Sequence, residues 1–334
     1  MLTALRNPLA YLATRWTPQP RTVRRAALAA LAMSVLIVVT GGAVRLTESG
    51  LGCDTWPKCS DDSLVATPEM GLHGFIEFGN RLMAYVVSAA VGWFIVAARC
   101  AKPRRRSLTR LGWAQFWVVA SNGVVGGITV LTGLNPYVVA AHFLAAMALL
   151  TTTTLGWVRS REGDAPPRPL IGSTMRRGVL GLTALSGALV VVGTAVTGSG
   201  QHAGDASEDI ERMPFDWDTI TRVHSGLAWA VVLGTVALWA GLRLMDAPPA
   251  PRARLRDLLL VLLAQGAIGY AQYALDEPEL LVGFHLFGAT LVWIAVLRVL
   301  LATRERGPAT PPEDRHPDAE ATAATPAPRV TATT

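Results

Sequence analysis

Residues 26–44 read AALAALAMSVLIVVTGGAV, a run of 19 residues without a charged side chain. A helix needs roughly 20 apolar residues to cross the hydrocarbon core of a bilayer, so this run predicts a membrane-spanning helix. Seven further stretches have a similar length and character. The eight predicted helices cover 25–46, 73–98, 111–133, 137–158, 178–199, 220–242, 256–274 and 280–301. The sequence therefore predicts an all-α integral membrane protein with eight transmembrane helices.

The amino-acid composition supports this prediction. Hydrophobic residues make up 51% of the 334 residues, charged residues only 16%, and the mean hydropathy is +0.36. A soluble domain usually contains about a quarter charged residues. The charges gather in the segments between the apolar stretches, which leaves each stretch suited to contact with membrane lipid.

The distribution of basic residues predicts the orientation of the helices. Most of the 30 Lys and Arg residues lie before the first predicted helix, after the last one, and in the connections that follow the second, fourth and sixth. The remaining connections are rich in Asp and Glu. Basic residues favour the cytoplasmic side of a membrane, so both termini are predicted to be cytoplasmic. The net charge of +6 thus reflects topology, and nucleic acid is excluded as a partner.

The two halves of the sequence resemble each other. Gly126 and His142 are matched by Gly269 and His285, each 143 residues later, and residues 47–50 match residues 197–200 at an offset of 150. Each half then contains four helices and enters the membrane in the same orientation. This pattern predicts two pseudo-symmetric four-helix bundles related by a parallel repeat. The predicted parts are a cytoplasmic arm (1–24), an N-terminal half (25–158), a cytoplasmic linker (159–177), a C-terminal half (178–301) and a disordered cytoplasmic tail (302–334).

Three histidines lie a few residues inside the outer ends of predicted helices, namely His142, His224 and His285. Ionisable residues are rare at such positions in a membrane and usually serve a function. Histidines at one depth on different helices suit axial ligation of haem iron. A single histidine of this kind is more often a hydrogen-bonded core residue, but the repeat of the pattern in both halves favours ligation.

The N-terminal half departs from this pattern at one position. His224 corresponds to Asn80, 144 residues earlier, so the C-terminal half has a histidine pair while the N-terminal half has His142 and Asn80. A pair of histidines closes both axial positions, whereas a weak or missing ligand leaves iron open to substrate or oxygen chemistry. Glu77 lies three residues before Asn80 on the same helix face and is the candidate acid, base or electrostatic stabiliser. The alternative role for Glu77 is an ion pair with Arg81.

Four other polar residues are candidates for contact with haem. Arg45 and Arg81 suit pairing with the propionate groups, because guanidinium matches carboxylate geometry. His202 lies among glycines in an outer loop, where the backbone can approach a ligand closely. His73 lies one turn before Glu77 and either replaces the missing ligand, passes protons, or is an interface residue.

Two of the three cysteines, Cys53 and Cys59, lie in the first outer loop. The extracytoplasmic compartment is oxidising, so these two residues are predicted to form a disulfide, with Trp56 and Pro57 between them favouring a turn. Two free thiols are the alternative. Cys100 lies at the cytoplasmic end of a predicted helix and is expected to stay reduced.

Taken together, these segments resemble the haem A synthases. The resemblance rests on GGAVRLTESGLGC at 41–53, WPKC at 56–59, EFGNR at 77–81, GGITVLTGLNP at 126–136 followed by His142, and TGSGQHAGD at 197–205. With the eight helices, these segments cover nearly the whole chain except the tail. The ordered set is more specific than any one of its members.

The resemblance implies that a ring methyl group of haem O is oxidised to the formyl group of haem A, through hydroxylated intermediates. It implies a resident haem b on His224 and His285, His142 as a ligand of the substrate haem, and Glu77 as the catalytic carboxylate. Cys53 and Cys59 would be the outer-loop cysteine pair. Asn80 stands where the commoner family pattern has a second histidine, which puts bis-histidine ligation of the substrate haem in doubt.

The expected partners and location follow from the same resemblance. Haem O synthase would supply the substrate, and assembly of a terminal oxidase would use the product. Lys58 and Lys102 are the only lysines among the 30 basic residues, which is typical of a GC-rich bacterial genome, so the protein is placed in a bacterial plasma membrane with its haem sites near the extracytoplasmic face.

Two other kinds of protein would share parts of this pattern. A dihaem b-type electron-transfer protein predicts two bis-histidine sites, and Asn80 argues against the second one. A transporter built from parallel repeats predicts helix breaks at the midplane. The polar residues of this sequence gather instead at the outer ends of the helices.

Overall fold

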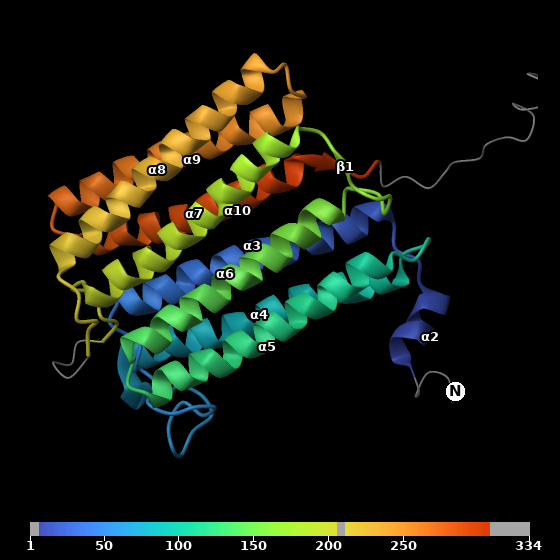
Figure 1. The fold of residues 1–334 in the computed structure, drawn as a ribbon. Helices are drawn as coiled ribbons and strands as arrows, with labels where there is room; N and C mark the ends of the chain where they lie inside the picture. Colours follow the sequence, from blue (N-terminus) through green and yellow to red (C-terminus); the bar gives the residue numbers. More distant parts are fainter. Residues whose placement is uncertain (1–6, 206–210, 308–334) are drawn as a thin grey trace, which may run out of the picture.

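The computed structural model describes residues 7–205 and 211–307, which are almost entirely helical (Figure 1). Two two-residue strands, β1 and β2, pair antiparallel, Arg168 with Glu305 and Pro169 with Arg304. The elements are α2 (Pro8–Arg15), α3 (Pro20–Leu46), η1 (Pro68–Met70), α4 (Gly71–Cys100), α5 (Arg106–Leu131), α6 (Pro136–Arg159), β1 (Arg168–Pro169), α7 (Ser173–Ser199), α8 (Trp217–Leu244), α9 (Pro249–Ala274), α10 (Glu279–Ala302) and β2 (Arg304–Glu305).

All eight apolar stretches form helices, and most of these helices are longer than predicted. Among the described residues, seven helices are long and apolar enough to cross a membrane: α3, α4, α5, α6, α7, α8 and α10. Helix α9 is the exception. Arg252, Arg254, Arg256 and Asp257 fill its first turns, and Gln265 and Gln272 interrupt the apolar part that follows. Its composition is therefore less apolar than that of the other seven helices.

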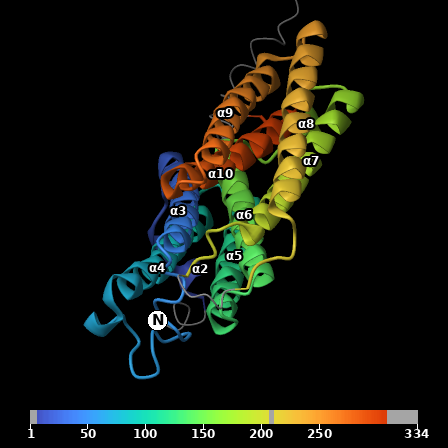
Figure 2. The same cartoon turned by 90° about the vertical axis from the view of Figure 1, so that its left-hand side faces the viewer.

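The helices pack as two neighbouring groups (Figure 1 and Figure 2). Helix α3 contacts α4 and α6, and α5 contacts α4 and α6; likewise α7 contacts α8 and α10, and α9 contacts α8 and α10. The groups meet where α10 lies against α3 and α6, and where α6 lies against α7. Each group therefore closes on itself, and the middle of the molecule is formed by α3, α6, α7 and α10.

The contact between the groups is mainly apolar. Leu31, Val38, Met147 and Leu150 are buried there and pack against side chains from α7 and α10. One hydrogen bond crosses the same surface, in which Trp293 Nε1 donates to Thr151 Oγ1 at 2.9 Å. Burial of such apolar side chains gives this contact its main stabilisation.

The two ends of the helical bundle differ (Figure 1). The connections 47–67, 200–205 and 211–216 lie at one end, called here the loop end, whereas α2, β1 and β2 lie at the other. At the loop end, Ser49 and Asp205 form an isolated β-bridge that joins the two connections. Residues 1–6 of the predicted arm, 206–210 of the second connection and 308–334 of the predicted tail lie outside the described residues.

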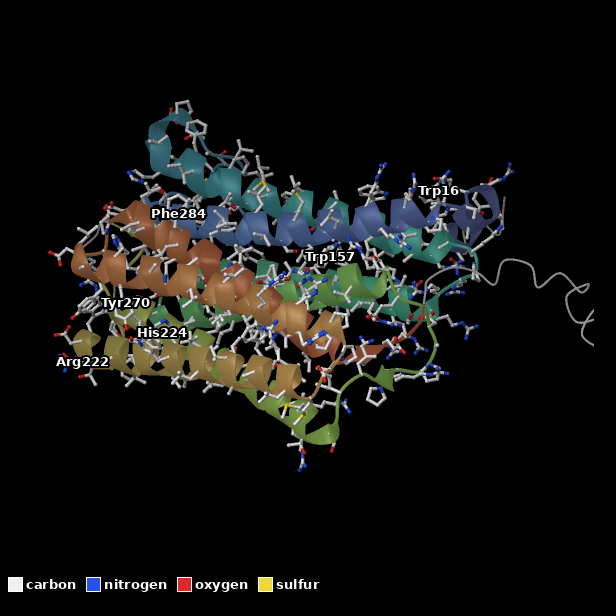
Figure 3. All side chains as sticks on the ribbon, turned by 90° about the horizontal axis from the view of Figure 1, so that it is seen from above. Trp16, Trp157, Arg222, His224, Tyr270 and Phe284 are labelled. Atoms are coloured by element: carbon white, nitrogen blue, oxygen red, sulfur yellow. A yellow bond between two sulfur atoms is a disulfide. The ribbon has the colours of Figure 1, made fainter. Side chains whose placement is uncertain are left out.

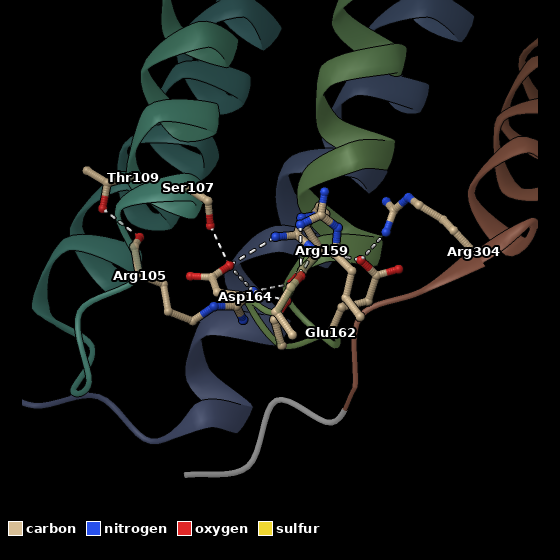
Figure 4. A network of polar contacts seen from close by, with 10 residues as sticks. Arg105, Ser107, Thr109, Arg159, Glu162, Asp164 and Arg304 are labelled. Atoms are coloured by element: carbon tan, nitrogen blue, oxygen red, sulfur yellow. Dashed lines mark hydrogen bonds and ion pairs between the residues drawn. The ribbon is translucent and has the colours of Figure 1, made fainter. Parts of the chain in front are cut away.

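An ion-pair network joins the helix ends opposite the loop end (Figure 4). Asp164 Oδ1 lies 3.1 Å from Arg105 Nη2, 2.9 Å from Arg159 Nη2, and accepts a 2.7 Å hydrogen bond from Ser107. Glu162 bridges Arg159 and Arg304 at 2.8 Å and 3.1 Å. The network thus ties the start of α5, the end of α6 and strand β2 together.

We expect Asp164→Ala to lower the free energy of unfolding by about 1–2 kcal/mol, a value reduced for the 40% exposure of its side chain. The loss arises because Arg159, whose side chain is only 10% exposed, loses one of its two carboxylate partners. Thermal unfolding in detergent measures the change. The matched control is Asp257→Ala, since Asp257 pairs only with Arg254 and Arg256 on its own helix. Equal melting temperatures for the two variants would contradict the prediction.

The same network predicts how stability depends on pH. Burial opposes ionisation of Asp164, but hydrogen bonds from Arg105 and Ser107 and the charges of Arg105 and Arg159 hold its pKa below the ordinary value. A carboxyl with a lowered folded-state pKa stabilises the protein above its unfolded-state pKa of about 4 and loses that effect as pH falls through the folded-state pKa. The difference between the wild type and Asp164→Ala should therefore disappear in acid.

Candidate functional site

His224 on α8 and His285 on α10 face each other inside the C-terminal group of helices. Their ring centroids are 6.3 Å apart and the ring planes are inclined by 62°. Figure 3 shows His224 toward the loop end of the bundle, together with Arg222 and Tyr270 and far from Trp16. Neither imidazole Nδ1 makes a hydrogen bond of normal geometry, although the backbone carbonyls of Leu189 and Gln265 lie beside the two rings.

The distance between these rings fits a shared metal centre. Metal–imidazole bonds of about 2 Å place the centroids of two rings on opposite sides of one metal roughly 6 Å apart. The second nitrogen of a metal-bound histidine usually faces a backbone carbonyl or a carboxylate, as the Leu189 and Gln265 carbonyls do here. No group of three or more His, Cys, Asp or Glu residues in the described ranges is placed to hold a metal ion. A porphyrin supplies four nitrogens itself, so two histidines are sufficient.

A glycine on the neighbouring helix lies against each of the site histidines. A Cβ atom at Gly193 would lie 3.1 Å from His224 Cε1, and one at Gly269 would lie 3.2 Å from His285 Cε1. These distances are shorter than ordinary van der Waals contacts. The two glycines therefore let the imidazole rings pack directly on the backbone of α7 and α9.

The N-terminal group of helices repeats this arrangement with one change. A Cβ atom at Gly126 would lie 3.0 Å from His142 Cε1, and one at Gly41 would lie 3.7 Å from Asn80 Nδ2. Asn80 Oδ1 accepts a 2.8 Å hydrogen bond from Thr40 Oγ1 on α3. The oxygen of the Asn80 amide therefore accepts a hydrogen bond from a neighbouring helix, whereas His142 Nδ1 is buried and has no hydrogen-bond partner among residues 7–205 and 211–307.

Glu77 on α4 is buried, with 5% of its surface exposed, and both carboxylate oxygens are engaged. Cys53 N–H donates to Oε2 at 2.6 Å, and Arg81 Nη2 and Nε donate to Oε1 at 2.6 Å and 3.1 Å. The ion pair with Arg81, weighed above as an alternative role, is therefore present. A carboxylate held by one backbone amide and one guanidinium is well fixed in position, which suits both a structural and a catalytic role.

Arg81 also contacts the backbone of residues 53–58, the loop that contains Cys53. Its guanidinium donates to the backbone oxygens of Cys53, Thr55 and Lys58 at 3.2 Å, 3.0 Å and 2.9 Å. Together with the bond from Cys53 N–H to Glu77, these contacts fix residues 53–58 beside the start of α4. Arg81 thus contacts protein groups in place of the carboxylate of a ligand.

The predicted disulfide between Cys53 and Cys59 is confirmed. The segment between them reaches the neighbouring helix, where a Cβ atom at Gly127 would lie 2.5 Å from the Trp56 ring. Gly127 directly follows Gly126, the glycine that packs against His142. The disulfide loop therefore covers the part of α5 next to this histidine. Cys100 is free and buried.

Three further candidate residues contact the protein itself. Arg45 donates to the backbone oxygens of His202 and Thr197 at 2.7 Å and 2.9 Å, which joins α3 to the end of α7. His202 Nε2 lies 2.8 Å from the backbone oxygen of Glu277. His73 Nδ1 lies 3.0 Å from Ser49 Oγ.

Two hollows open at the loop end. One, of about 460 Å³, lies beside the disulfide and is lined by Glu48, Leu51, Gly52, Asp54, Cys59, Ser60, Met70, His73 and Asp205. The other, of about 400 Å³, is lined by Leu46, Thr47, Glu48, Gln201, His202 and Glu279. Neither hollow contains Glu77 or a site histidine other than the peripheral His73 and His202.

The paired histidines and the buried carboxylate agree with a comparison of the sequence with protein families. The family model described as COX15-CtaA, cytochrome oxidase assembly protein, matches residues 24–297. The chain belongs to the COX15-CtaA family. The matched range contains every site residue described above.

Individual COX15-CtaA relatives are modestly similar. The "Heme A synthase" of Azorhizobium caulinodans is 29% identical over 335 residues, which cover 83% of this chain and 93% of that protein. The "Heme A synthase" of Lysinibacillus sphaericus is 29% identical over 177 residues, 51% of this chain and 56% of that protein. A "Protoheme IX farnesyltransferase" of Thermus thermophilus is 27% identical over 301 residues, 83% of this chain and 48% of that protein. The chain thus spans about half the length of several relatives that it matches.

Several residues around the COX15-CtaA site were not singled out from the sequence. The sequence indicates only a turn at Trp56. It does not predict that Gly41 packs against Asn80 or that Gly193 packs against His224. Packing of a glycine against each histidine could have been predicted, because Gly126 and Gly269 repeat together with His142 and His285 at the same offset. The contact of Arg81 with the loop carbonyls leaves no comparable pattern in the sequence.

Proposed function

We propose that this protein oxidises a ring methyl group of haem O to the formyl group of haem A. The observation that carries the proposal is the difference between the two halves. One half has His224 and His285, whose ring centroids are 6.3 Å apart, and at the corresponding positions the other has Asn80 and His142, with the buried carboxylate of Glu77 one turn from Asn80. A closed pair suits a resident haem b, whereas an open site suits a haem that is bound, changed and released.

In this proposal His224 and His285 hold the resident haem b, which supplies electron-transfer chemistry when bound. His142 binds the iron of the substrate haem. Glu77 is the catalytic carboxylate, and its position relative to the substrate is set by Cys53 N–H and Arg81. Asn80 completes the same face of α4, one turn from Glu77.

The membrane arrangement is part of the same proposal. All eight long helices cross a bacterial plasma membrane, α9 included, because the helical contacts within α7–α10 match those within α3–α6. The halves are a parallel repeat, both termini are cytoplasmic, and the loop end faces outward. The Cys53–Cys59 disulfide supports this orientation, since disulfides persist outside the cytoplasm.

A related protein supports haem O synthase as the partner that supplies the substrate. The Thermus thermophilus relative is named for farnesyl transfer to protohaem, and this chain aligns with only 48% of its length. We infer that the two reactions are consecutive and that the product is used in assembly of a terminal oxidase.

The second candidate is a dihaem b-type electron-transfer protein, which the His224–His285 pair favours for one half only. The N-terminal half has Asn80 in place of the second histidine, and the Asn80 oxygen accepts a hydrogen bond from Thr40. The two candidates differ in whether haem is chemically changed.

Haem analysis tests the proposal. The full chain is co-expressed with a protohaem farnesyltransferase in a host that makes no haem A, and extracted haems are separated by chromatography and identified by mass. We expect hydroxylated and formyl haem in addition to haem O. Unchanged haem O in cells that contain the folded protein, with its low-spin haem spectrum, would overturn the proposal and favour electron transfer.

The glycines beside the histidines provide a further prediction. In Gly269→Ala the new methyl group pushes on the His285 ring, and we expect several-fold lower haem b content together with a shifted low-spin absorption spectrum. The matched control is Gly266→Ala on the same helix, since a Cβ atom at Gly266 meets no atom within 4 Å. Glycine-to-alanine changes inside helices otherwise stabilise by about 1 kcal/mol. Identical spectra for both variants would contradict the positioning role of Gly269.

A further inference from the structure

Four polar side chains near the loop end of the C-terminal half have a buried atom without a hydrogen-bond partner within the described ranges. They come from three helices: Ser199 Oγ, Trp217 Nε1, Thr221 Oγ1 and Gln272 Oε1. Folded proteins satisfy nearly all of their buried polar groups, so an unsatisfied group needs an explanation. Several unsatisfied groups in one region point to a bound ligand.

The contacts of Trp217 bring these groups together. Its ring stacks on Tyr273, with centroids 5.6 Å apart and planes inclined by 7°, and Gln272 precedes Tyr273 on α9. A Cβ atom at Gly200 would lie 3.2 Å from Trp217 Nε1, and Ser199 precedes this glycine. The last residue of α7 with Gly200, the start of α8 and the end of α9 therefore bring these unsatisfied groups into one region, called here the recess.

The recess lies on the outer side of the histidine pair. Trp217, Thr221 and His224 are spaced at i, i+4 and i+7 and lie on one face of α8. At 1.5 Å per residue, Thr221 lies about 4.5 Å and Trp217 about 10 Å above His224 along the helix. Gln272 lies one turn beyond Gly269, the glycine that packs on His285.

The loop end closes the recess from outside. Gln201 Nε2 donates to the Asp276 backbone oxygen at 3.0 Å, and His202 Nε2 lies 2.8 Å from that of Glu277. These contacts join the end of α7 to the turn between α9 and α10.

The N-terminal half shows what the missing partners would be. The positions that correspond to Thr221, Trp217 and Ser199 are Glu77 and His73, 144 residues earlier, and Ser49, 150 residues earlier. All three have partners: Cys53 N–H donates to Glu77, and Ser49 Oγ lies 3.0 Å from His73 Nδ1 and 2.9 Å from Thr47 Oγ1. The equivalent positions of the C-terminal half lack such partners, which leaves them for a ligand.

The chemistry of the recess indicates what that ligand presents. An indole N–H only donates, and hydroxyl groups donate readily, so Trp217, Ser199 and Thr221 offer three donors to an acceptor-rich group. We propose that this recess binds a propionate carboxyl group of the porphyrin held between His224 and His285. The inference rests on the proposed resident haem.

One carboxyl group lies at the edge of the recess. A Cβ atom at Gly200 would lie 3.6 Å from Glu277 Oε2. Burial raises the pKa of Glu277, against smaller lowering effects of His202 and Gln201. A carboxyl group that ionises less readily repels a neighbouring propionate less.

The test compares two porphyrins on the full chain in detergent. The protein is stripped of haem and titrated with protohaem or with protohaem dimethyl ester, in which both carboxylates are masked, and the low-spin absorption spectrum is followed. We expect the wild type to bind protohaem at least tenfold more tightly than the ester. In the triple variant Ser199→Ala, Trp217→Phe, Thr221→Val we expect this preference to fall toward one, with ester binding unchanged.

Two single variants keep the inference testable if the triple variant does not fold. Trp217→Phe keeps an aromatic ring that can stack on Tyr273. On its own it should lower the preference for protohaem over the dimethyl ester several-fold. Trp229→Phe on the same helix is the matched control, because Trp229 Nε1 already donates to the Tyr270 hydroxyl at 2.9 Å, and it should keep the wild-type preference.

The outcomes separate this inference from the proposed function. Equal binding of the two porphyrins by the wild type, or an unchanged preference in both the triple variant and Trp217→Phe, would overturn carboxylate binding in the recess while the haem site stands. No low-spin binding of either porphyrin by the folded wild type would overturn the resident haem and this inference with it.

Discussion

Replacing Glu77 by glutamine is expected to stop haem A formation while the low-spin spectrum of the resident haem b remains. Glutamine has the same size and its side-chain oxygen still accepts the Cys53 N–H, so the loop stays in place. The negative charge is lost, and with it the capacity to accept a proton or stabilise a developing positive charge. Loss of a general acid or base lowers a rate by about 10²–10⁴-fold. The measurement is haem A formed per resident haem b.

Two comparisons separate catalysis from anchoring of the loop. Glu77→Ala removes both the charge and the acceptor for Cys53 N–H, whereas Glu77→Gln removes the charge, keeps an oxygen that accepts Cys53 N–H, and places an amide NH2 group opposite Arg81. If Glu77 is catalytic, both variants are inactive; if it only anchors the loop, the glutamine variant keeps its activity and the assignment fails. Glu69→Gln, an exposed position in the same half, is the control and should keep wild-type activity.

The same carboxylate explains why the two halves can have different roles. Thr221 occupies the position that Glu77 has in the N-terminal half, and His224 occupies that of Asn80. The C-terminal half therefore has a second histidine but no carboxylate at this level, and the N-terminal half has a carboxylate but no second histidine. One half is suited to hold a haem, and the other to act on one.

Periodic and covalent features of this protein could be predicted from the sequence. The helices follow from runs of about 20 apolar residues, and the level of His142 and His285 follows from their equal distance from Gly126 and Gly269. The disulfide follows from two cysteines in one outer loop. Each of these features depends on residues that are near in sequence or repeat at a fixed offset.

Features that depend on packing between distant segments could not be predicted. Nothing in the sequence shows that Arg81 reaches the carbonyls of residues 53, 55 and 58, or that Arg45 reaches those of Thr197 and His202. Arginine suits carboxylates in general, but backbone oxygens at loop ends compete for the same donors. The sequence was thus informative about residue types at the site and silent about their partners.

Replacing His224 by asparagine, which copies the residue at Asn80, is expected to remove the low-spin haem b spectrum. A neutral amide binds iron far more weakly than imidazole, so His285 alone would remain as a ligand. Loss of outer-shell partners alone typically costs 10–100-fold in metal affinity, and loss of a direct ligand should reduce haem content by at least about tenfold. Absorption spectroscopy and the haem-to-protein ratio measure the change.

The control for this variant is His202→Asn. His202 lies at the loop end with its Nε2 against the Glu277 backbone oxygen, so its loss should leave the low-spin spectrum intact. His224→Asn should also stop haem A formation if electrons pass through the resident haem, whereas Glu77→Gln stops it with that haem in place. The two variants therefore have the same effect on product and opposite effects on the spectrum. A low-spin spectrum that persists in His224→Asn would reject His224 as a ligand, because the 6.3 Å ring pair would then serve only packing.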